Sequence, residues 1–104
     1  MIFADEETEH AYDKSNKFMQ ALVSSFEAMC FEYGEEMIVI ELKSDYCVVL
    51  GCDLSYDVSY HLHERFNALY RRQDVRYETL SLIDPELGIW NIYADSGKNL
   101  INLN

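Results

Sequence analysis

The stretch EMIVIELKSDYCVVLG, residues 36–51, decides the fold because apolar side chains recur there with the period of a β hairpin. Glu36–Lys43 and Tyr46–Gly51 are predicted to be two strands joined by a tight turn at Ser44-Asp45. The second strand is apolar on both faces, which indicates an interior position in a sheet. The apolar face of the first strand is predicted to consist of Ile38, Ile40 and Leu42, with Glu41 and Lys43 on the other face.

The segment before this hairpin, up to Gly34, has the pattern of an amphipathic helix. Its apolar residues cover an arc of about 140° when plotted at 100° per residue, so this arc is expected to face a core. They are Phe18, Met19, Leu22, Val23, Phe26, Met29, Cys30 and Tyr33. Gly34 tolerates the left-handed backbone that commonly follows a helix end. Residues 1–13 hold five acids and no Lys or Arg, which indicates a solvated acidic lead-in that frays.

The segment after the hairpin is ambiguous between strand and helix. Over residues 54–62 apolar and polar residues alternate, yet Leu54, Val58, Leu62 and Phe66 also form a helical stripe. Tyrosine and valine favour strands, so we interpret 54–62 as a strand followed by a short helix over 63–73. Two more strands are predicted at Val75–Ile83 and Ile89–Ala94, around a turn at Asp84–Gly88, with a docked tail containing Leu100, Ile101 and Leu103.

These elements predict a single α+β domain spanning residues 1–104, including the 1–13 lead-in. We expect an antiparallel sheet of four to five strands. A long N-terminal helix packs on one face of it, and the second helix is short.

Net charge restricts the function. The chain has 19 acidic and 8 basic residues, for a formal net charge of −11, and 49% hydrophobic content. That much apolar sequence is incompatible with compositional disorder. Direct binding to nucleic acid or to an anionic membrane is disfavoured, because such affinity comes mainly from clustered Lys and Arg. No apolar run approaches the roughly 18 to 20 residues of a membrane helix. Three cysteines cannot all pair within one chain and no secretion signal is evident, so a cytoplasmic location is expected.

Catalytic and metal patterns are weak. Cys47, Cys52, His61 and His63 are residue types that bind zinc, but positions 47 and 52 fall on opposite faces of a regular strand. Glu41 and Lys43 match the E-x-K fragment of metal-dependent nucleases, without the upstream aspartate on a neighbouring strand. Ser55 and Ser59 lack the glycine turn of a nucleophile elbow. We therefore predict no enzyme activity, no cofactor and no metal.

The acidic charge is concentrated near the start of the chain. Residues 1–36 carry nine acids and two lysines, for a net −7, whereas residues 37–104 carry ten acids and six bases, for a net −4. On the first helix Phe31 falls on the polar side, as an aromatic contact anchor would. The residues predicted to bind a partner are Glu6, Glu7, Glu9, Glu27, Phe31, Glu32, Glu35 and Glu36. Those predicted to serve assembly or internal pairing are Arg65, Arg71, Arg72 and Arg76.

The leading functional hypothesis is an acidic inhibitor or adaptor that docks on the basic surface of another protein, such as the nucleic-acid site of a nuclease or DNA-handling protein. The alternative is a chaperone or immunity-type protein, acting as a homodimer, that captures a client segment by strand addition. Bacterial secretion chaperones are similar in size, acidity and α+β plan, although no motif supports the analogy. A third hypothesis is a small metal-dependent hydrolase or nuclease.

We predict that the protein forms no complex with duplex or single-stranded DNA at physiological salt, because its net charge of −11 repels phosphate. Electrophoretic mobility-shift assays measure this directly. A salt-sensitive complex that Arg71→Glu abolishes would contradict it.

Overall fold

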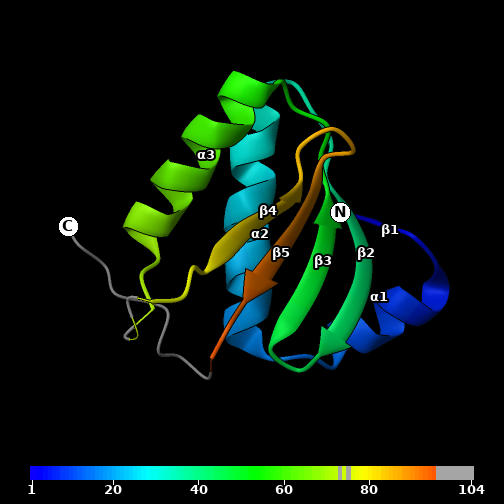
Figure 1. Ribbon diagram of the computed structural model, residues 1–104. Coiled ribbons are helices and arrows are strands. Elements are labelled where there is room, and N and C mark those ends of the chain that lie inside the picture. The colour runs from blue at the N-terminus through cyan, green and yellow to red at the C-terminus, as the bar shows by residue number, and fades with distance from the viewer. Residues whose placement is uncertain (73, 75, 96–104) are drawn as a thin grey trace.

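The hairpin of residues 38–51 lies in the middle of a five-stranded sheet (Figure 1). The computed structural model describes residues 1–72, 74 and 76–95. The strands follow the order β1-β2-β3-β5-β4 across the sheet, so β3 is central as expected. Their bounds are β1 Ile2–Phe3, β2 Ile38–Ser44, β3 Cys47–Gly51, β4 Leu80–Asp84 and β5 Ile89–Tyr93.

The sheet is mixed, which corrects the prediction of an antiparallel sheet. β1 pairs parallel to β2 through Ile2 opposite Ile38, whereas the other three pairings are antiparallel. The predicted turn at Asp84–Gly88 joins β4 to β5, and Gly88 has the positive φ of 67° that the turn requires. The strand predicted at Val75–Ile83 is shorter in the structure, because β4 begins at Leu80. Val75 lies outside the described residues, and so does the predicted tail with Leu100, Ile101 and Leu103.

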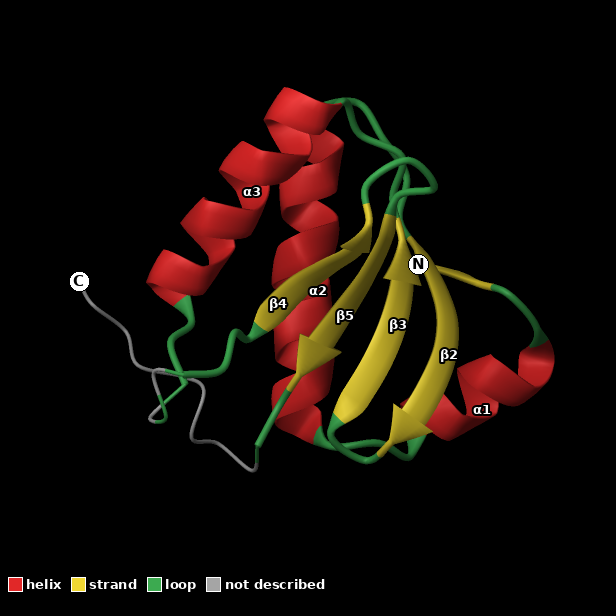
Figure 2. Ribbon diagram, viewed as in Figure 1, coloured by secondary structure: helices red, strands yellow, loops and turns green. Residues whose placement is uncertain are grey.

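Three helices accompany the sheet: α1 Glu6–Asp13, α2 Lys17–Glu32 and α3 Tyr56–Leu69. α2 and α3 cover one face of the sheet, and α1 lies beside β2 at the opposite edge from α3 (Figure 2). None of the described helices is both long enough and apolar enough to cross a membrane.

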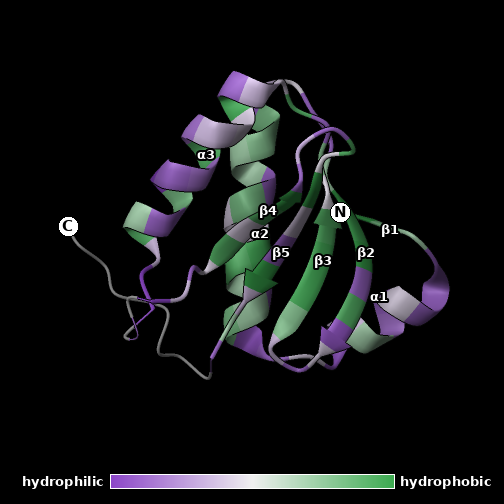
Figure 3. Ribbon diagram, in the orientation of Figure 1, coloured by the Kyte–Doolittle hydropathy of each residue, from purple (hydrophilic) through white to green (hydrophobic). Residues whose placement is uncertain are grey.

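The core lies between α2, α3 and the sheet, where the inner faces of the elements are apolar (Figure 3). Phe26 of α2 is fully buried and contacts two other rings, with ring centroids 5.1 Å from Trp90 and 6.1 Å from Phe66. Tilted and edge-to-face arrangements at these separations are the favourable ones for aromatic pairs. The predicted apolar arc of α2 is confirmed at six buried positions: Met19, Leu22, Val23, Phe26, Met29 and Cys30.

The predicted facing of β2 is wrong at Ile38 and confirmed at Leu42. Val39 is fully buried, while Ile38 is exposed, so the core residue is the one that simple alternation placed outside. The register shifts between Val39 and Glu41, and an extra residue in one strand reverses the facing of those that follow. Leu42 consequently packs against the core, although it lies three positions from Val39.

The strand predicted over 54–62 is wrong, because residues 56–62 form the first half of α3. The helix predicted over 63–73 is confirmed over residues 63–69, as the second half of α3. Ser55 caps this helix, its hydroxyl accepting a hydrogen bond from the Val58 amide at 3.4 Å. Leu62 and Phe66 are fully buried, and the helical stripe therefore provides the core contacts. Tyr56 and Tyr60 remain on the outer side, where their preference for strands carries little weight.

The acidic lead-in of residues 1–13 is folded into β1 and α1, which corrects the expectation that it frays. Asp5 caps α1 by accepting a hydrogen bond from the Thr8 amide at 2.8 Å. Tyr12 is buried and donates to the Gln20 carbonyl at 3.3 Å, while the Gln20 side-chain amide donates to the Tyr12 carbonyl at 2.8 Å. Burial raises the pKa of Tyr12 to about 12. The helix is thus fixed against α2.

Two glycines with positive φ provide a matched stability test. A Cβ at Gly34, φ 77°, would have no atom within 4 Å, so Gly34→Ala should cost only about 1 kcal/mol of unfolding free energy. A Cβ at Gly88 would lie 2.4 Å from the Cys52 carbonyl oxygen, so Gly88→Ala should cost at least about 3 kcal/mol. Urea denaturation measures both, and equal losses would contradict the packing described at Gly88.

Candidate functional site

The residues of the zinc hypothesis are held apart. Cys47 lies opposite Tyr93 in the sheet and its thiol interacts with that ring's hydroxyl, whereas the Cys52 thiol interacts with Cys30 in the core. His61 is exposed, and the His63 imidazole lies 3.1 Å from the Glu78 carboxylate. Within the part of the chain that is described, no group of three or more His, Cys, Asp or Glu side chains is placed to hold a metal ion.

The three thiols are all free and all buried. The hydrogen bond with Cys52, followed by burial, raises the pKa of Cys30, and burial raises the pKa of Cys47. A thiol with a raised pKa is a poor nucleophile and a poor metal ligand at neutral pH. Cys30 and Cys47 therefore act as small buried residues, and Cys52 packs in the same core cluster as Cys30.

The serines of the nucleophile hypothesis are engaged with backbone. The Ser55 hydroxyl caps α3, and the Ser59 hydroxyl donates to the Leu54 carbonyl at 3.4 Å. His63 faces Glu78, so the contacts of Ser55, Ser59 and His63 do not pair a hydroxyl with a base. These three residues are therefore not arranged as a nucleophile with its oriented base.

The four arginines have different surroundings. Arg65 of α3 donates to both carboxylate oxygens of Glu32 on α2, the shorter contact being 2.8 Å, and this lowers the pKa of Glu32. Arg76 pairs with Asp74 at 2.9 Å. Arg72 pairs with Asp95 and stacks on the rings of Tyr77 and Tyr93. Arg71 is exposed.

One acidic surface is formed by α1 and the neighbouring part of β2. Between them lies an open groove of about 440 Å³, with carboxylates from both elements and three apolar side chains in its lining. The side chains lining it are Asp5, Glu7, Thr8, Ala11, Ile40, Glu41 and Leu42. Among the ion pairs formed by the described residues, none involves Glu6, Glu7, Glu9, Asp13 or Glu41. The charge of this surface is therefore not neutralised within the molecule.

The polar arc of α2 adjoins this acidic surface. Gln20 binds α1 directly, and the Glu27 carboxylate lies 4.0 Å from the Met1 amine, next to β1. Phe31 lies one helical turn beyond Glu27 and is 56% exposed. Glu35 and Glu36 are exposed in the link to β2, while Glu32 turns toward α3 and Arg65. Of the eight predicted partner-binding residues, Glu7 thus lines the groove beside β2, and Glu32 is paired with Arg65 of α3.

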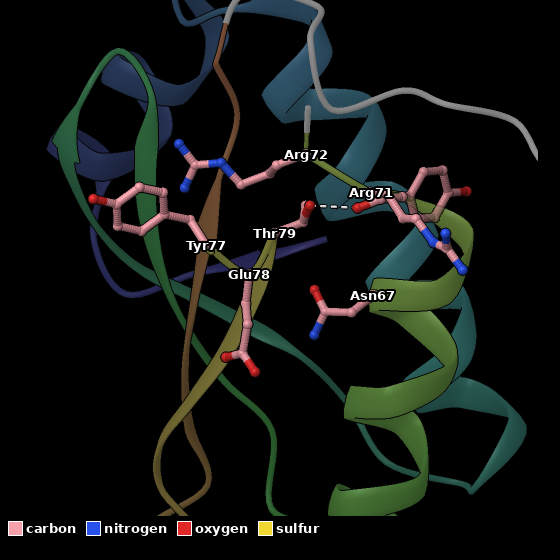
Figure 4. Close-up of a pocket in the computed structure, with 7 residues that line it drawn as sticks. Asn67, Arg71, Arg72, Tyr77, Glu78 and Thr79 are labelled. Atoms are coloured by element: carbon pink, nitrogen blue, oxygen red, sulfur yellow. Dashed lines mark hydrogen bonds between the residues drawn. The ribbon is translucent and has the colours of Figure 1, made fainter. Parts of the chain in front are cut away.

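A second groove, which the sequence did not predict, lies between α3 and the start of β4 (Figure 4). Its wider part has a volume of about 310 Å³, and Figure 4 shows Arg71 and Arg72 pointing in different directions from its rim. It is lined by Asn67, Tyr70, Arg71, Arg72, Tyr77, Glu78 and Thr79. The Asn67 amide forms two hydrogen bonds with the backbone of Leu80, accepting at 2.9 Å and donating at 2.8 Å. Interpreting 54–62 as a strand concealed this groove, because only a continuous helix aligns these side chains.

Two strands of the sheet are irregular, the outer strand β4 and β2, which lies next to the outer strand β1. The register shifts twice along β2, between Val39 and Glu41 and between Leu42 and Ser44, and once along β4, between Leu82 and Asp84. Bulges of this kind interrupt the regular hydrogen-bonding edge that an added strand requires. On β4 the side chain of Asn67 also occupies the edge groups of Leu80. The geometry therefore favours contacts through side chains over capture of a client strand.

Comparison with known proteins gave no match to a family model, to a curated protein or to a solved structure.

We predict that the purified protein contains no stoichiometric zinc and that its thiols react slowly with a thiol reagent until the chain is unfolded, because all three cysteines are buried. Elemental analysis and reagent kinetics with and without denaturant measure this. Stoichiometric zinc that is lost in Cys47→Ser or His61→Ala would show that the protein adopts a different arrangement.

Proposed function

We propose that this chain is a non-catalytic binding protein that docks on a basic surface of a partner protein through its acidic edge. We define the acidic edge as α1, the adjoining part of β2 and the carboxyl end of α2. The observation that supports this most is the groove between α1 and β2, which is lined by the carboxylates of Asp5, Glu7 and Glu41 together with apolar side chains. A surface of this composition suits Lys or Arg side chains, whose aliphatic stems pack on apolar groups while their charges meet the carboxylates.

Local folding explains only part of this acidity. Glu6, Glu7 and Glu9 are in the first turn of α1, where negative charge interacts favourably with the helix dipole. Glu32 is explained by its ion pair with Arg65. Glu41 on β2 gains neither benefit. Because unpaired like charges oppose the compact state, their concentration on one edge supports a role outside the fold.

Electrostatic attraction of this kind would act on the rate and the specificity of association. A surface of one sign steers an oppositely charged partner into encounter, and the effect falls as salt screens it. The partner class that we propose is a protein that handles nucleic acid, because carboxylates fixed on a rigid helix can occupy sites that otherwise bind phosphates. The chain would then act as an inhibitor or adaptor by nucleic-acid mimicry.

Charge reversal on the acidic edge tests this proposal. Partners are captured on the immobilised protein at low salt, and their release by added duplex DNA is measured. The double variant Glu7→Lys with Glu41→Lys should capture at least tenfold less, since it replaces two carboxylates of the groove. The matched control is Asp45→Lys with Asp53→Lys, two exposed acids elsewhere, because both double variants change the net charge from −11 to −7 (two substitutions of +2 each).

Phe31→Ala provides a second arm. Removal of a contact anchor commonly costs about 2 kcal/mol or more of binding energy, roughly thirtyfold in affinity, whereas an exposed ring contributes little to folding. Binding should therefore weaken while the melting temperature stays nearly constant. Equal capture by the two lysine double variants, or partners that duplex DNA fails to release, would contradict nucleic-acid mimicry through this edge.

A further inference from the structure

The groove beside α3 has two parts. The second, about 260 Å³ in volume, is lined by Tyr56, Tyr60, His63, Glu78, Leu82 and Pro85. Glu78 lines both parts, and its carboxylate lies 3.1 Å from the His63 imidazole, so this contact between α3 and the segment before β4 separates them. On the helix side a stripe at helical spacing runs from Tyr56 through His63 to Asn67, and Arg71 follows the end of the helix at Leu69. We refer to the two parts together as the α3–β4 groove.

The margins of this groove are unusually apolar for an exposed surface. Tyr56 is 63% exposed and Tyr60 is 52% exposed, with their ring centroids 5.8 Å apart. Across the groove it is lined by the apolar residues Leu82 and Pro85. Single exposed apolar residues are common, but a pair of rings that lines a groove marks a contact surface. Tyrosine in particular is enriched in such contacts.

This side of the molecule also carries the least charge. Residues 56–95 contain seven acids and four arginines, for a net −3, whereas residues 1–55 contain twelve acids and three lysines, for a net −9. Two copies of so acidic a chain repel each other least when they meet through the α3–β4 side. That orientation also leaves both acidic edges free.

Charge along the groove is arranged with opposite signs at its two ends. The exposed acids Asp57 and Glu86 lie at the end where α3 begins and the β4–β5 turn closes, while Arg71 lies at the other end (Figure 1). A two-fold axis through the middle of the groove would bring the basic end of one copy to the acidic end of the other. Such an isologous contact satisfies both ends twice.

We propose that the α3–β4 groove is the interface of a two-fold symmetric homodimer of this chain. A stable interface needs about 800 Å² from each partner. α3 is about 21 Å long at 1.5 Å per residue, and together with the β4–β5 turn it runs along one side of the molecule. The molecule measures 35 × 31 × 21 Å and exposes 6200 Å² of surface, so this required area is a small part of the whole. The contact is made by side chains, since Asn67 and the bulge restrict the β4 edge, and the paired tyrosines of each copy lie at the end where α3 begins.

Sedimentation velocity over a range of protein concentrations tests this. The native chain should be a dimer, and Tyr60→Ala should raise its dissociation constant about thirtyfold or more, because it removes an aromatic anchor. The matched control is Tyr46→Ala, which removes an exposed tyrosine in the β2–β3 turn and should leave the dimer intact. Urea denaturation checks that both variants remain folded.

A charge exchange tests the symmetry. Arg71→Glu and Glu86→Arg should each weaken the dimer, because each places like charges against one another at both ends, and the double variant should regain most of the lost affinity. A native chain that is monomeric at every concentration would overturn the proposal, as would a dimer that neither Tyr60→Ala nor Arg71→Glu affects.

If the native chain is monomeric and Tyr60→Ala reduces capture of a basic protein, the groove belongs to another partner and the dimer is wrong. Glu7→Lys with Glu41→Lys should leave dimerisation unchanged, so failure of this proposal and failure of the acidic edge are distinguishable.

Discussion

Burial of Trp90 is the constraint on which the rest of the structure depends. Its ring packs on Phe26 of α2, and its indole N–H donates to the Cys52 carbonyl at 3.2 Å, so one side chain joins β5, α2 and the end of β3. The Cys52 amide in turn donates to the Gly88 carbonyl at 2.8 Å. An indole buried without a partner for its N–H would be costly, so this hydrogen bond fixes where β3 ends. The chain then leaves the sheet and starts α3 three residues later at Ser55.

This junction determines where both candidate surfaces lie. Because α2 and α3 cover one face of the sheet, α1 is left at the edge of β2 and α3 lies beside β4. The acidic groove and the tyrosine-lined groove are consequently on opposite edges of the sheet. A molecule arranged in this way can bind a basic partner on one edge and a second copy of itself on the other without competition between them.

The contrast between the two edges is electrostatic. At the first edge the carboxylates of α1 and β2 lack internal cations, so their field extends into solvent and falls with salt. Near the second edge Arg65, Arg72 and Arg76 are paired with Glu32, Asp95 and Asp74, which leaves Arg71 as the exposed cation of its groove. Internal ion pairs thus neutralise most of the charged groups near the α3–β4 edge, whereas the carboxylates at the α1 edge keep their charge.

The sequence by itself determined the α+β class, the hairpin of β2 and β3, the central position of β3 and the buried arc of α2, because each depends on a local period of apolar residues. It also located the acids that gather at the α1 edge, since they are concentrated in residues 1–36. Only the tertiary structure decided that 54–62 is helical, because Leu62 and Phe66 gain more by packing on α2 than the tyrosines gain in a strand. The bulge that follows Val39 and the parallel pairing of β1 likewise depend on residues distant in the chain. The α3–β4 groove follows from that helix, so no local pattern reveals it.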